Sequence, residues 1–240
     1  MQIAIVLYDG MTALDAVGPY EVFRFLPDVE LRFVSDSPRP IMTDSGVLVL
    51  GATHSYEETR SPEIVLVPGS SADTTTAMAD ASLIAWLQTV HKTSKLTLSV
   101  CSGALILGAA GILDGHPATT HWIAQKALGN FGAKSIREKR VVRSGKIITG
   151  AGVSAGIDLA LSIIVDLYGM ERAEVIQLLI EYDPHPPVDS GHPSKASKKV
   201  YRIAKAEMLA EGKNIKNMVS IPKILWRNAL NRVRKRLGRN

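Results

Sequence analysis

The sequence has a single cysteine, Cys101, among its 240 residues. One cysteine excludes an intrachain disulfide and any zinc or iron–sulfur site built from several thiolates, and it favours a reducing compartment. The longest apolar runs, such as 104–113, are far too short to span a bilayer. No basic region or small-residue cleavage site precedes the first apolar segment. We therefore expect a cytoplasmic protein.

Motifs for metals and nucleotides are also missing. The six histidines show no spacing typical of metal ligands, so we expect no metal. Gly150 and Gly152 are followed by a third glycine at Gly156, which misses the spacing of a dinucleotide-binding loop, and we expect no cofactor. His121 is the only histidine in an apolar context, where a core histidine with its hydrogen bonds satisfied is the common outcome.

Charge is divided unevenly along the chain. Residues 195–240 contain fourteen Lys and Arg against two Glu, a net charge of +12. Residues 1–194 contain the other fourteen basic residues against twenty-one acidic ones, a net charge of −7. The basic character therefore belongs to the C-terminal segment alone.

Strand and helix patterns alternate through residues 1–194. Apolar runs such as 3–8, 64–67 and 96–100 are typical of strands buried on both faces, and amphipathic segments such as 81–91 separate them. This alternation predicts a three-layer α/β fold with a mainly parallel sheet. We expect one α/β domain over 1–194 and a basic helical extension over 195–240, with helical stretches at about 197–210 and 222–237.

Cys101 lies where an apolar strand runs into a helix. At such a junction the turn residue sits at the carboxyl end of the sheet, beside unpaired helix N–H groups, which favour a thiolate over a thiol. The alternative is a buried cysteine that only fills space. The position and the following Ser102-Gly103 favour the functional interpretation.

Two other loops should meet Cys101, because ligands in open α/β sheets bind outside the carboxyl ends of the strands. Asp15 follows the first strand and is either a proton partner of the thiol or a helix cap, since Gly18-Pro19 predicts a break in its helix. Gly69 and Ser70 follow a second strand, and their amides either bind a developing negative charge or only form a tight turn. A further helix is expected over 116–128.

Several segments together resemble the ThiJ/PfpI superfamily and, within it, the isocyanide (isonitrile) hydratase branch. They are Cys101-Ser-Gly-Ala-Leu-Ile-Leu-Gly-Ala-Ala-Gly-Ile-Leu113, Ala118-Thr-Thr-His-Trp122, Gly150-Ala-Gly-Val-Ser-Ala-Gly-Ile-Asp158, Leu14-Asp-Ala-Val-Gly-Pro19 and Glu181-Tyr-Asp-Pro-His-Pro-Pro187.

The resemblance implies a flavodoxin-like sandwich, a homodimer and no cofactor. It implies that Cys101 is the nucleophile, that Asp15 is its proton partner and that the hydroxyl of Ser102 helps to position the site. Ser70 stands where the family usually has glycine, which raises the question of whether its amide reaches the same place. The implied activity is hydration of an isocyanide, R–N≡C, to the N-substituted formamide by cysteine nucleophilic catalysis.

Other functions within the superfamily stay open. The chain resembles the protease branch less than the hydratase branch, because Ser102 stands where proteases of the superfamily have a histidine. It also resembles the glyoxalase-like members less, because they use Glu where this chain has Asp15. A ligand-sensing regulator and a redox sensor are the non-catalytic alternatives. The basic extension has three possible partners: its own dimer, an anionic membrane or nucleic acid.

Overall fold

The computed structural model describes residues 1–211 and residue 224. Its centre is a seven-stranded sheet in the order β10-β11-β7-β6-β1-β2-β5, parallel except for the β10–β11 pair. The strands of this sheet are β1 (Gln2–Val6), β2 (Glu30–Ser35), β5 (His54–Ser55), β6 (Ile64–Val67), β7 (Leu96–Ser99), β10 (Val141–Ser144) and β11 (Ile147–Gly150). The expected mainly parallel sheet is confirmed.

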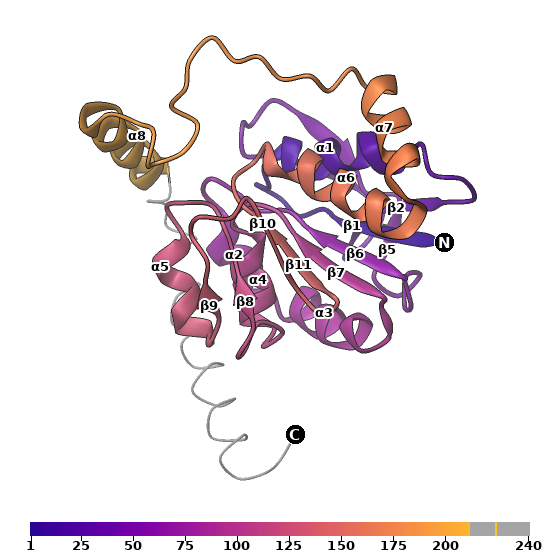
Figure 1. The fold of residues 1–240 in the computed structure, drawn as a ribbon. Helices are drawn as coiled ribbons and strands as arrows, with labels where there is room; N and C mark the ends of the chain where they lie inside the picture. The colour runs from indigo at the N-terminus through magenta and orange to yellow at the C-terminus, as the bar shows by residue number, and fades with distance from the viewer. Residues whose placement is uncertain (212–223, 225–240) are drawn as a thin grey trace.

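Helices cover both faces of the sheet (Figure 1). One face carries α1 (Ala13–Phe23), α6 (Ala155–Tyr168) and α7 (Met170–Leu179), and the other carries α2 (Thr74–Ala79), α3 (Ala81–Thr93), α4 (Gly103–Ala109) and α5 (Gln125–Leu128). This arrangement makes the flavodoxin-like three-layer sandwich. The central strands are buried on both faces, which explains their unbroken apolar sequence.

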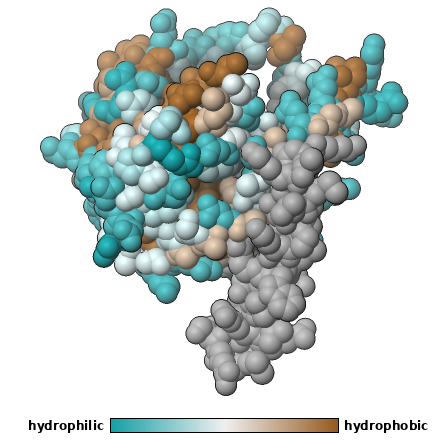
Figure 2. Space-filling model, turned by 180° about the vertical axis from the view of Figure 1, so that it is seen from behind, coloured by the Kyte–Doolittle hydropathy of each residue, from teal (hydrophilic) through white to brown (hydrophobic). Residues whose placement is uncertain are grey.

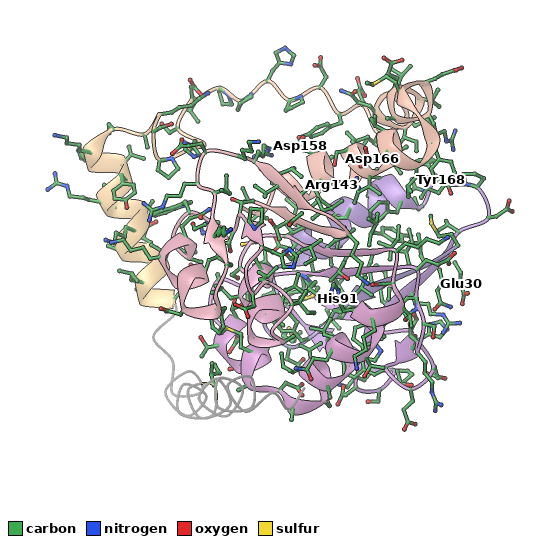
Figure 3. All side chains as sticks on the ribbon, turned by 60° about the horizontal axis from the view of Figure 1, so that its bottom comes forward. Glu30, His91, Arg143, Asp158, Asp166 and Tyr168 are labelled. Atoms are coloured by element: carbon green, nitrogen blue, oxygen red, sulfur yellow. The ribbon has the colours of Figure 1, made fainter. Side chains whose placement is uncertain are left out.

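Smaller elements complete the structure. They are the hairpin β3 (Pro40–Met42) with β4 (Val49–Gly51), the parallel pair β8 (Pro117–Ala118) with β9 (Lys134–Ser135), and the short 3-10 helix Gly129–Phe131. Figure 3 labels Arg143 of β10 and Asp166 of α6, whose side chains form an ion pair of 2.8 Å that ties the sheet edge to its covering helix. Every helix among the described residues is too short or too polar to traverse a bilayer.

The predicted break at Gly18-Pro19 is wrong, because α1 continues through Pro19. A proline here removes the hydrogen bond to the carbonyl of Asp15. Close packing on α6 compensates for this loss: a Cβ at Gly156 would lie only 3.1 Å from the Pro19 ring. The contact with Gly156 thus accommodates the proline inside a continuous helix, with Asp15 in its first turn.

The predicted helix over 116–128 is also mostly wrong, because only α5 is helical. Tertiary hydrogen bonds keep two residues before it out of a helix: the Thr119 N–H donates to Thr149 Oγ1 (2.8 Å) and Thr120 Oγ1 donates to the Cys101 carbonyl (2.7 Å). These partners are distant in sequence, so local pattern gave no sign of them.

The C-terminal extension begins with α8 (Lys198–Glu211), which agrees with the helix expected over 197–210. It follows the irregular segment that leaves α7 and crosses to the other end of the molecule (Figure 1). The expected helix over 222–237 lies outside the described residues apart from residue 224. The boundary at 194/195 stays a prediction.

Candidate active site

Three loops meet at the carboxyl ends of adjacent strands. Asp15 follows β1, Gly69 and Ser70 follow β6, and Cys101 follows β7, and these strands are neighbours in the sheet. The chain places β2 on one side of β1 and β6 on the other, so this point is also the switch in strand order, where α/β proteins bind their ligands.

Cys101 occupies a strained turn between β7 and α4. Its φ of 57° is in the left-handed region, which a residue with a Cβ adopts at a cost on the order of 1 kcal/mol. Hydrogen bonds hold the conformation: its N–H donates to the Ala151 carbonyl (2.7 Å) and its carbonyl accepts from Thr120 Oγ1 (2.7 Å). The sharp turn brings the thiol to the end of the sheet.

Two glycines allow the loops to approach this turn. A Cβ on Gly103 would lie 2.2 Å from the Val67 carbonyl oxygen, and one on Gly69 would lie 2.5 Å from the Ser102 nitrogen. No flexible side chain can yield at these contacts because the obstacles are mainly backbone atoms. The glycines therefore serve the close packing of the β6 loop against the Cys101 turn.

Asp15 is a fully buried carboxyl beside the thiol of Cys101. The Gly69 N–H donates to its Oδ2 (2.8 Å), whereas Oδ1 has no hydrogen-bond partner among the described residues. Burial raises the pKa of Asp15 to about 7, and the bonds from Gly69 and Cys101 offset this only in part. A carboxyl with this pKa and a free oxygen is suited to proton transfer near neutral pH.

The pKa of Cys101 is raised well above its ordinary value, first by burial and then by the negative charge of Asp15. Hydrogen bonds from the backbone and side chain of Ser102 oppose this shift. The expectation of a resting thiolate favoured by helix amides is therefore wrong, because burial outweighs those amides. The thiol is therefore protonated at rest, beside a carboxyl whose pKa is about 7.

Ser102 connects the Cys101 turn to the β6 loop. Its hydroxyl accepts from the Ser70 N–H (2.9 Å), donates to the Ser70 carbonyl (3.0 Å) and lies 2.6 Å from Thr74 Oγ1. The hydroxyl expected to position the site is thus bonded on three sides, and Thr74 is a partner that the sequence did not indicate.

Ser70 does not need the backbone conformation of glycine, since it is absent from the residues with positive φ. Its hydroxyl donates to the Gly10 carbonyl (2.5 Å) and accepts from the N–H groups of Ala72 and Asp73, so it organises the loop before α2. The amides of Gly69 and Ser70 already donate to Asp15 and Ser102. These contacts hold Asp15 and Ser102 in place and leave neither amide free in this structure for a developing negative charge.

The thiol opens into a cavity of about 840 Å³. Besides Cys101, Ser102 and Ser70, it is lined by Thr12, Asp44, Ser45, Ser71, Ala72, His121, Ile123, Val153, Met208, Leu209 and Glu211. His121 is not the satisfied core histidine that the sequence suggested, because its Nδ1 has no partner among the described residues. Burial lowers the pKa of His121, so its imidazole is neutral at pH 7.

The sequence profile of the DJ-1/PfpI family matches residues 1–166. The chain belongs to this family. It is 38% identical to an isonitrile hydratase of Pseudomonas putida over 196 residues, which cover 82% of this chain and 85% of the relative.

Solved structures of other DJ-1/PfpI proteins superpose on the fold. A ThiJ/PfpI family protein from Pseudomonas syringae matches with a TM-score of 0.84 and 39% identity over 91% of this chain and 90% of its own. Drosophila melanogaster DJ-1beta matches with a TM-score of 0.68 over 75% of this chain and 97% of its own, and its 18% identity shows a shared fold alone.

Within this DJ-1/PfpI site, the sequence indicated the strand-end residues Cys101, Asp15, Gly69, Ser70 and Ser102, and the structure brings all five together. It did not indicate the residues that surround them. Thr12 and Asp44, for example, are joined by a hydrogen bond of 2.5 Å between hydroxyl and carboxylate across 32 residues, and no local motif marks either one. Among the described residues, no three His, Cys, Asp or Glu side chains gather as a metal-ion site.

Proposed function

We propose that this protein hydrates isocyanides to N-substituted formamides, with Cys101 as nucleophile and Asp15 as proton carrier. The observation that carries the proposal is the buried carboxyl of Asp15 beside the thiol, with its pKa near 7. The similarity to an isonitrile hydratase over most of both chains supports this choice of reaction within the family.

The first step forms a covalent intermediate. Asp15 takes the proton of Cys101, and the thiolate attacks the terminal carbon of R–N≡C. Asp15 returns that proton to the same carbon, which gives the thioimidate R–N=CH–S–Cys101. The N–H of Ser102 stabilises the thiolate while the proton is away.

The second step consumes water. Its oxygen adds to the thioimidate carbon and a proton goes to nitrogen, giving R–NH–CH(OH)–S–Cys101. The C–S bond then breaks as the carbonyl forms, and the hydroxyl proton returns to the sulfur through Asp15. The products are R–NH–CHO and the original thiol–carboxylate pair, so the cycle needs no external acid or base.

The direct test is to incubate the full chain with cyclohexyl isocyanide and to follow N-cyclohexylformamide by chromatography. We expect enzyme-dependent formation of the formamide, while a parallel incubation with methylglyoxal gives no lactate. Lactate formation without isocyanide turnover would assign the glyoxalase-like activity instead. No turnover of either compound would favour a sensing role.

Redox sensing fits the site less well. Oxidation of a cysteine by peroxide needs the thiolate and access to solvent. Cys101 is only 4% exposed, and burial together with Asp15 raises its pKa. Both features slow direct oxidation by peroxide.

The cavity lining also predicts discrimination by charge. Asp44 and Glu211 contribute carboxylates, and no Lys or Arg is among the described residues that line the cavity. Two like charges about 6 Å apart repel by roughly 3 kcal/mol at an effective dielectric constant near 20. We therefore expect kcat/KM for isocyanoacetate to be at least about tenfold below that for methyl isocyanoacetate, because only the former carries a charge.

Glu211→Gln should reduce the difference in kcat/KM between isocyanoacetate and its methyl ester, since it removes one of the two carboxylates. Glu207→Gln is the matched control, because Glu207 lies on the same helix but does not line the cavity. Equal rates for the acid and the ester in the wild-type protein would contradict the electrostatic argument.

A further inference from the structure

Helix α8 forms an outer wall of the active-site cavity. Met208, Leu209 and Glu211 line the cavity that opens onto Cys101, although they lie more than 100 residues away in sequence. The family profile ends at residue 166, so this wall comes from outside the matched domain. The cavity therefore has two parts: a reaction centre at the sheet ends and a wall from the extension.

Aromatic rings join α8 to the α/β body. Its Tyr201 ring packs on Trp122, with ring centroids 5.2 Å apart, and Trp122 packs on His121 at 5.6 Å. His121 lines the same cavity. The contact thus links the helix to the loop that carries the pocket histidine and Ile123.

The two sides of α8 are different. Met208, which is partly buried, and Leu209, which is 50% exposed, line the cavity, whereas Val200 and Ile203, which are 44% and 49% exposed, do not. Seen from behind in Figure 2, α8 at the upper right shows hydrophilic residues interrupted by a hydrophobic patch. No residue of α8 is fully buried, so the helix covers the cavity without joining the core.

The apolar lining lies on both sides of the space above the thiol. Ile123 and Val153 come from the α/β body, and Met208 and Leu209 come from α8. A substrate whose isocyanide carbon meets Cys101 must extend its substituent into this space. We infer that Met208 and Leu209 of α8 are specificity-determining residues, which select isocyanides with a bulky, uncharged apolar substituent; this inference rests on the proposed hydratase function.

The test replaces Met208 by a larger and by a smaller side chain. Met208→Trp should lower kcat/KM for cyclohexyl isocyanide at least about tenfold and leave ethyl isocyanide within about twofold, because only the larger substituent reaches the wall. Met208→Ala should raise KM for cyclohexyl isocyanide about tenfold, with a smaller change in kcat, by loss of apolar contact. Ile203→Trp and Ile203→Ala are the controls on the outer side of α8. They should change the kinetic constants for neither substrate.

A second readout does not depend on hydratase activity. The rate of Cys101 alkylation is measured by intact mass with N-cyclohexylmaleimide and with iodoacetamide. Met208→Trp should lower the rate of alkylation by N-cyclohexylmaleimide several-fold and leave the rate with iodoacetamide unchanged. Ile203→Trp should change neither rate. If alkylation shows this size effect and no isocyanide is turned over, the proposed function is wrong, but Met208 still limits the size of the molecules that reach Cys101. If Met208→Trp behaves like Ile203→Trp in both assays, the inference is wrong.

Discussion

Replacing Cys101 by serine is expected to reduce formamide production at least about a thousandfold, a typical consequence of removing a covalent nucleophile. Serine nearly preserves the size of the side chain, but its hydroxyl does not ionise near neutral pH. Asp15 alone is a weak base with a pKa of about 7 and cannot generate an alkoxide in its place. The measurement is the initial rate of N-cyclohexylformamide formation at saturating cyclohexyl isocyanide.

The matched control for this variant is Ser99→Ala. Ser99 is buried two residues before Cys101, and its Oγ has no hydrogen-bond partner among the described residues. Removal of this hydroxyl should therefore leave both the fold and the rate near wild type. Retention of more than a tenth of wild-type turnover in Cys101→Ser would rule out attack by the sulfur.

Asp15→Asn is expected to lower kcat roughly a hundred- to ten-thousandfold, the usual range for loss of a general acid–base group. The amide keeps nearly the same shape and can still accept from the Gly69 N–H, which bonds to Asp15 at 2.8 Å. It cannot take the proton of the thiol. Asp15→Glu restores the acid group but moves it by about one methylene, and a displacement of about 1 Å costs on the order of a hundredfold.

The pH dependence separates a proton-transfer role from a structural one. In the wild-type protein, kcat/KM should rise about tenfold per pH unit below pH 7 and level off above it, because the active pair carries one proton rather than two. This step follows from the Asp15 pKa of about 7. The step should be absent in Asp15→Asn, whereas a merely structural role would leave it in place at reduced amplitude.

Stability should change with pH in the opposite direction. The pKa of Asp15 is raised from 3.8 to about 7 on folding, so between these values the native state holds a proton that the unfolded chain has lost. The free energy of unfolding therefore falls as pH rises through this window, by on the order of 2–4 kcal/mol in total. Asp15→Asn removes this penalty.

We expect Asp15→Asn to be more stable than wild type at pH 8 and to differ little from it at pH 4. Urea unfolding followed by circular dichroism at the two pH values gives the comparison. A variant that is less stable than wild type at pH 8 would contradict the assigned pKa shift.

The elements nearest the reaction centre could be predicted because their constraints are local. A strand such as β6, buried on both faces, needs an unbroken apolar run, and its end marks the loop of Gly69 and Ser70. Cys101 is marked by the strand–helix junction around it. Because parallel strands end at one edge of the sheet, these loops could be expected to meet before any coordinates were known.

The parts that could not be predicted depend on contacts between distant residues. Pro19 stays inside α1 because Gly156 of α6 lies against it. Thr119 and Thr120 stay out of a helix because they bond to Thr149 of β11 and to the Cys101 carbonyl. The protonation state of the thiol differs from the sequence prediction for the same reason: the helix amides can be inferred from the sequence, whereas the burial that outweighs them cannot.

The shared proton between Cys101 and Asp15 is tested most directly by the pH profile of Cys101 alkylation with iodoacetamide, compared between wild type and Asp15→Asn. We predict that the wild-type rate rises to a plateau near pH 7, where Asp15 becomes the acceptor of the thiol proton. Asp15→Asn should lack that step and react only as its thiol ionises at higher pH. Superimposable profiles for the two proteins would show that Asp15 does not take the proton of Cys101.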